Sequence, residues 1–230
     1  MTTMTLKSLP DNPWVALPHQ APFVLPDDAL AVEVFNRTAD SAHRLHVETP
    51  PEPFFGSIDA PIAVLLLNPG VTSDGKYDDE RLLGAVRNSN DQDGHFYIGA
   101  ENFWWDKLVR SLSRDRPNVD VASAILSIEY FPYRSISFGC GHVRVPSQGF
   151  GFALVERAIE RDAVIVIVRG ERIWLGAVPK LADHGKVVRI KNPQSASLSS
   201  RNLQDDGYQK LLDALDSHGG SASHAIAACA

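Results

Sequence analysis

Short continuous apolar runs alternate along this chain with longer segments in which apolar residues recur at helical spacing. The runs 62–67 and 163–168 contain no polar residue, which is typical of strands buried on both faces of a sheet. Weaker runs at 121–130 and 186–190 predict two more strands. Helices are predicted at 77–87, 101–113, 151–160, 171–182 and 204–216. This alternation predicts an α/β fold, three-layer α/β/α, with a mostly parallel four-stranded central sheet.

The two ends of the chain differ from this pattern. Residues 1–50 are rich in proline and polar side chains, and we interpret them as an arm packed over the domain, with one strand near 31–35. The Pro-Pro-Glu-Pro segment at 50–53 is expected to be a stiff connector. The α/β domain then spans 51–217, and the small, weakly patterned residues 218–230 are expected to form a flexible tail.

Composition restricts the function only loosely. Of the 230 residues, 44% are hydrophobic and 22% are charged, and the formal net charge is −6. An acidic total counts against strong non-specific binding of nucleic acid, although a local basic face remains compatible with it. The chain has two cysteines, no long apolar run and no secretory pattern at its start, so a cytoplasmic protein without a membrane partner is expected.

Two Asn-Pro turns follow predicted strands. Asn68-Pro69-Gly70 ends the first apolar run, and Asn192-Pro193 follows the last predicted strand. One such turn by itself is equally well explained as a simple strand terminator. Because the carboxyl ends of parallel strands meet at one edge of the sheet, two of them predict a pocket with both amide side chains over one cleft.

The two turns also carry a family resemblance. Leu-Asn-Pro-Gly-Val-Thr-Ser at 67–73 resembles the first motif of the mismatch-specific (thymine/uracil) branch of the uracil-DNA glycosylase superfamily. Asn192-Pro193, followed by Ser197-Leu198-Ser199, resembles the second motif, and a looser likeness extends from about 53 to 215. The chain departs from the family in two places. Three residues, 194–196, lengthen the second motif, and Asn68 stands where the classical branch has a catalytic aspartate.

The resemblance implies hydrolysis of the bond between a flipped-out base and its sugar in damaged or mismatched DNA. An amide is not a general base near neutral pH, so Asn68 would position the attacking water. Backbone N–H groups in the segment Pro69, Gly70, Val71 and the Asn192 amide would stabilise charge on the base. Ser197 and Ser199 would hold phosphates, and Leu198 would fill the vacated stack. Neither a cofactor, a metal nor an obligate protein partner is expected, and the protein would be a monomer.

Other assignments stay open in the sequence. Phe96, Tyr97 and Phe103 are candidates for an aromatic floor under the base, and each is also a plausible core residue. Glu129 either reads a base edge or pairs with Arg134. A DNA enzyme should gather a basic rim around the pocket, for which the candidates are Lys76, Arg134, Arg144, Lys191 and Arg201. Two other functions remain: a non-catalytic nucleobase- or nucleotide-binding protein, and an N-glycosidase of small nucleosides.

Overall fold

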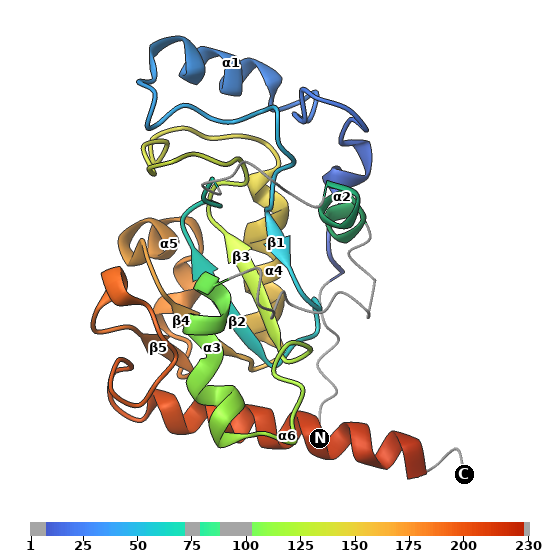
Figure 1. The fold of residues 1–230 in the computed structure, drawn as a ribbon, viewed down its shortest axis with the longest axis vertical. Coiled ribbons are helices and arrows are strands. Elements are labelled where there is room, and N and C mark those ends of the chain that lie inside the picture. Colours follow the sequence, from blue (N-terminus) through green and yellow to red (C-terminus); the bar gives the residue numbers. More distant parts are fainter. Residues whose placement is uncertain (1–7, 72–78, 88–102, 228–230) are drawn as a thin grey trace.

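The computed structural model describes residues 8–71, 79–87 and 103–227, and it contains a five-stranded sheet with helices around it (Figure 1). The strands are β1 (Phe54–Phe55), β2 (Ile62–Leu66), β3 (Ile125–Glu129), β4 (Val164–Ile167) and β5 (Val187–Arg189), in the order β1-β3-β2-β4-β5. Strands β2 to β5 are parallel, which confirms the α/β prediction. The predicted number of four strands is wrong, because β1 adds an antiparallel edge strand beside β3.

The extra strand is short and follows a proline-rich segment, so its sequence shows no strand pattern. Phe54 pairs with Ile128 and Phe55 with Ser127. The Glu129 N–H donates to the Pro53 carbonyl at 2.9 Å, which extends the pairing by one bond. The segment at 50–53 therefore leads directly into the sheet edge, next to the carboxyl end of β3.

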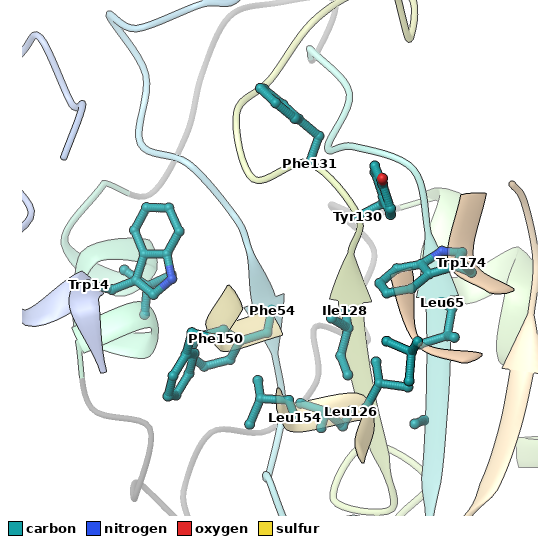
Figure 2. Packing of buried hydrophobic residues seen from close by; sticks show 14 of the residues in the cluster. Trp14, Phe54, Leu65, Leu126, Ile128, Tyr130, Phe131, Phe150, Leu154 and Trp174 are labelled. Atoms are coloured by element: carbon teal, nitrogen blue, oxygen red, sulfur yellow. The ribbon is translucent and has the colours of Figure 1, made fainter. Parts of the chain in front are cut away.

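Helices lie on both faces of the sheet because successive side chains of the buried strands point in opposite directions. Leu65 of β2 contributes to a core with α4 (Gln148–Glu160) and α5 (Glu171–Ala177), part of which Figure 2 shows. Val64 contributes to a second core with α3 (Phe103–Asp115) and α6 (Gly207–Ala227). The predicted strands thus have both faces covered, as continuous apolar runs require.

Several side chains from the first fifty residues contribute to the core. Trp14, in the 3-10 helix η1 (Pro13–Ala16), is fully buried in the same cluster as Leu65 (Figure 2). The strand predicted near 31–35 is wrong, since these residues lie in α1 (Ala29–Thr38). A salt bridge between Glu33 and Arg37, four residues apart, is the helical signal that the sequence interpretation missed.

A buried carboxylate connects this arm to the loop after β3. Asp28 accepts hydrogen bonds from the Tyr133 hydroxyl at 2.7 Å, from the Ser147 hydroxyl at 2.5 Å and from the Ser147 N–H at 3.1 Å. Asp28 is wholly inaccessible to solvent, so these bonds replace the water it gives up. The arm therefore helps to fix the 130–137 segment, which forms one wall of the pocket described below.

The remaining helices complete the frame. Helix α2 (Asp79–Arg87) lies beside η1, where the Asn12 side-chain amide donates to the Val86 carbonyl at 2.8 Å. Helix α6 continues to Ala227 instead of ending at 216 as predicted, and it crosses one end of the molecule in Figure 1. No helix in the described ranges is both long and apolar enough to cross a membrane.

Candidate functional site

A pocket of about 620 Å³ opens at the carboxyl ends of the three central parallel strands. The chain adds β3 on one side of β2 and then β4 on the other side, so the strand order changes direction at β2. Open α/β sheets bind their ligands at such a point. Its walls come from the segments that follow β2, β3 and β4, from the start of α3 and from the residues before β1. They include Glu52, Leu66, Leu67, Asn68, Pro69, Gly70, Val71, Trp104, Trp105, Glu129, Arg134, Ser135, Ile136, Ser137, Phe138 and Arg169.

Asn68 lines this pocket with its amide in a defined orientation. Its Nδ2 donates to Ser135 Oγ at 2.7 Å and, at longer range, to the carbonyl oxygens of Pro69 (3.3 Å) and Tyr133 (3.4 Å). Carbonyl oxygens only accept hydrogen bonds, so the group that faces them must be the NH₂. The Asn68 Oδ1 accepts no hydrogen bond from the described residues and remains an acceptor for a ligand or a water molecule.

Glu129 is the second polar wall residue, and it is buried. It ends β3 beside Leu66 of β2, only 9% of its surface is exposed, and its Oε2 has no hydrogen-bond partner among the described residues. Burial, reinforced by the nearby negative charge of Glu52, raises the pKa of Glu129 well above its usual range, although Arg134 and Arg169 oppose the shift. Burial therefore favours the protonated form of this carboxyl, which has one donor and one acceptor to offer.

Arg134 forms a structural support of the pocket wall. Its guanidinium donates to Glu52 Oε2 at 2.5 Å, to the Pro50 carbonyl at 2.9 Å and to the Gly70 carbonyl at 2.9 Å. The salt bridge that the structure records for Arg134 is thus with Glu52, and the charge of Arg134 also acts on Glu129, where it favours the ionised form. The side chain is 5% exposed, so it is not part of an accessible basic rim.

Apolar and aromatic side chains line the rest of the pocket. Trp104 and Trp105, at the start of α3, form an edge-to-face pair with centroids 4.5 Å apart, and Trp104 is 36% exposed. Ile136, in the loop after β3, is 64% exposed and lines the pocket with its neighbour Phe138. The predicted floor residues Phe96 and Tyr97 lie outside the described residues, as does the side chain of Phe103.

The backbone of the first motif offers hydrogen-bond donors to this space. Gly70 and Val71 line the pocket, and their N–H groups donate to no acceptor among the described residues. Gly70 does not have a positive φ, and a Cβ added there meets no atom within 4 Å. Gly70 therefore does not supply the left-handed conformation for which turns often use glycine.

The second predicted motif lies outside the pocket lining. The Asn192 side-chain oxygen accepts from the N–H groups of Gln194 (3.1 Å) and Ser195 (3.4 Å), which caps the 3-10 helix η3 (Pro193–Ser195). The expectation that both asparagine amides lie over one cleft is therefore wrong. The link between this turn and the pocket is Arg169, whose Nε donates to the Pro193 carbonyl at 3.3 Å.

The residues that follow Asn192 also lie in positions other than those that their predicted roles require. Leu198 is fully buried in the core with α3, and its N–H donates to the Leu108 carbonyl at 2.7 Å, so it does not project as a wedge. The hydroxyls of Ser197 and Ser199 are 3.1 Å apart and bond to each other. None of these three residues lines the pocket, so the structure does not support the phosphate and wedge roles assigned to them.

The predicted basic rim is not assembled in the described part of the chain. Arg144 lies 5.3 Å from the centroid of the Tyr130 ring and does not line the pocket. Lys191 and Arg201 are exposed but are also absent from the lining, and Lys76 lies outside the described residues. Arg169, an exposed cation directly after β4 that was not among the rim candidates, does line the pocket.

Sequence reasoning thus found one half of the site. It placed Asn68 and Glu129 at the carboxyl edge of the sheet, but it did not predict that Trp104 and Trp105 pair at the pocket, that Ser135 contacts Asn68 or that Glu52 pairs with Arg134. Comparison of the chain with protein-family models, with curated proteins and with solved structures finds no match.

Proposed function

We propose that this protein binds a nucleobase in the pocket and hydrolyses its N-glycosidic bond, with uracil or another damaged base in DNA as the first substrate class. The first motif suggests this activity through its resemblance to uracil-DNA glycosylases, and with it a three-layer α/β/α fold. The supporting observation is that one pocket joins an oriented asparagine amide, at Asn68, to a buried carboxyl, at Glu129, whose protonated form is favoured by burial.

The chemistry of Glu129 fits the edge of a base. A neutral carboxyl donates one hydrogen bond and accepts another side by side, which complements a ring N–H next to a ring carbonyl, as in uracil. When the glycosidic bond breaks, negative charge develops on the departing base. The Glu129 hydroxyl would then donate to an increasingly basic oxygen, and this kind of interaction strengthens in the transition state.

Asn68 would serve the other reactant. Its Oδ1 would accept a hydrogen bond from a water molecule and hold that water for attack on the sugar carbon. The N–H groups of Gly70 and Val71 supply further donors to the same pocket. The exposed face of Trp104 would stack against a planar ring, as aromatic side chains do with bases.

A second candidate function is hydrolysis of small nucleosides. The observation that favours it is the position of the cations: Arg134 is buried against Glu52, and Arg144, Lys191 and Arg201 do not line the pocket. A DNA enzyme gains much of its affinity from phosphate contacts, whereas a nucleoside needs none. Arg169 is the described cation at the pocket that would meet a phosphate.

The test is base release by the purified protein. The substrates are labelled oligonucleotides with uracil opposite guanine, opposite adenine or in a single strand, and free uridine and deoxyuridine. Asn68→Ala should lower release on the order of 100-fold, as expected for loss of a residue that positions the attacking group. Asn192→Ala is the matched control, because that side chain caps its own turn.

Each outcome separates the candidates. Release from oligonucleotides that depends on Asn68 supports the DNA enzyme, and release from nucleosides alone supports the second candidate. Saturable binding of uracil without release would indicate a binding protein. Neither binding nor release of any of these compounds would reject a uracil site in this pocket.

A further inference from the structure

We propose that Ser135 is a positioning residue for Asn68, and that the acceptors around the Asn68 NH₂ make this position specific for an amide. Three oxygen atoms surround Nδ2, namely Ser135 Oγ and the carbonyl oxygens of Pro69 and Tyr133. The orientation of Oδ1 toward the pocket follows from this arrangement. Its catalytic consequence rests on the proposed function, but the arrangement itself is testable without a substrate.

Ser135 is itself held in place. It is 2% exposed, its N–H donates to the Pro69 carbonyl at 3.3 Å, and its hydroxyl donates to the Ser137 carbonyl at 2.8 Å. The Ser137 N–H in turn donates to the Ala42 carbonyl at 2.8 Å. A hydroxyl has a single proton, and here it is used, so Ser135 Oγ acts as an acceptor toward Asn68.

This arrangement discriminates against a carboxylate at position 68. An aspartate would place an oxygen without a proton against two carbonyl oxygens and a hydroxyl that already donates elsewhere. Such contacts favour the protonated form of the acid, because only that form can donate. The structure thus gives a physical reason for an amide at this position, and it predicts that Asn68→Asp does not provide a strong general base.

The first experiment measures hydrogen exchange of the Asn68 side-chain amide by NMR, in the unliganded protein. Ser135→Ala should accelerate exchange about fivefold to tenfold, the effect of losing one ordinary hydrogen bond. Ser135→Thr keeps the hydroxyl and should keep the slow exchange. Ser127→Ala is the control, because Ser127 is equally buried and donates to the Phe55 carbonyl but does not line the pocket.

The second experiment titrates the carboxyl introduced by Asn68→Asp, using ¹³C NMR and a thermal unfolding curve to establish that the variant is folded. A pKa above the usual aspartate range supports the proposal. An ordinary pKa, or equal exchange rates in Ser135→Ala and the wild type, would overturn it. If Asn68→Asp does not fold, the exchange comparison among the Ser135 variants decides the question alone.

Activity then connects this result to the proposed function. If the wild type releases bases, Ser135→Ala should lower kcat about fivefold to tenfold with little change in KM, because it loosens Asn68 without removing it. An unchanged kcat would show that the orientation of Asn68 does not matter for turnover. If the wild type is inactive on every substrate, the proposed function fails, while the two NMR measurements still decide the role of Ser135.

Discussion

Arg134→Ala tests whether this arginine supports the pocket wall or contacts a nucleic acid. The substitution removes the donors to the Glu52 carboxylate and to the backbone carbonyls of Pro50 and Gly70. The Glu52 side chain is 18% exposed and the Arg134 side chain 5%, so solvent compensates little for these losses. The substitution leaves a largely buried carboxylate unpaired in the wall that also holds Glu129.

The magnitude follows from that environment. Removal of one partner from a buried, hydrogen-bonded ion pair costs about 3–5 kcal/mol, mostly because the other charge stays buried. We expect a loss of about 3–5 kcal/mol in the free energy of unfolding, measured by urea denaturation. Arg37→Ala is the control, because the Arg37–Glu33 pair is exposed on α1 and should change stability by less than about 1 kcal/mol.

A double-mutant cycle identifies the partner. Arg134→Ala and Glu52→Gln should be clearly non-additive, by at least about 1 kcal/mol, because each removes the same pair. If Arg134→Ala changes stability by less than about 1 kcal/mol and instead weakens DNA binding with a smaller salt dependence, Arg134 contacts phosphate and the structural role is refuted.

Three further predictions concern single positions. The pKa of Glu129 is raised in the folded state, so the wild type loses stability as pH rises from the ordinary glutamate range through that raised pKa. Glu129→Gln removes this loss, so it should raise the Tm relative to the wild type more at pH 8 than at pH 5. An equal change in Tm at both pH values would contradict a raised pKa for Glu129. Asn192→Ala should lower stability by about 1 kcal/mol through loss of the η3 cap and leave base release unchanged; a large loss of release with the fold intact would restore the second motif to the site. Gly170→Ala should destabilise by about 1–2 kcal/mol or more in urea denaturation, because φ is +73° and the new Cβ would lie 2.4 Å from Leu67 Cδ2. Wild-type stability in that variant would show that the turn after β4 adopts another conformation.

The pattern of strands and helices in the sequence predicts the parallel part of the sheet and the edge at which the pocket lies. The run at 62–67 and the run at 163–168 have no polar face, so each had to be a strand covered on both sides, and the helical segments between strands required parallel order. Parallel order places the carboxyl ends of these strands at one edge, which is why the sequence alone assigns Asn68 and Glu129 to a common region.

Only the tertiary structure decided which neighbours these residues have. Local patterns report how a segment is buried, but β1 depends on the pairing of Phe54 and Phe55 with β3, which a local pattern does not show. The same limit applies to side chains. Asn192 and Asn68 follow strands with similar turns, yet one caps its own backbone and the other faces a pocket.

The chemistry of the site depends on distant segments for the same reason. The raised pKa of Glu129 results from its burial and from the charge of Glu52, which precedes β1 in the sequence. The orientation of Asn68 results from Ser135, which lies beyond the next strand. A sequence fixes which groups are available, whereas hydrogen-bond direction and ionisation depend on partners that meet only when the chain folds.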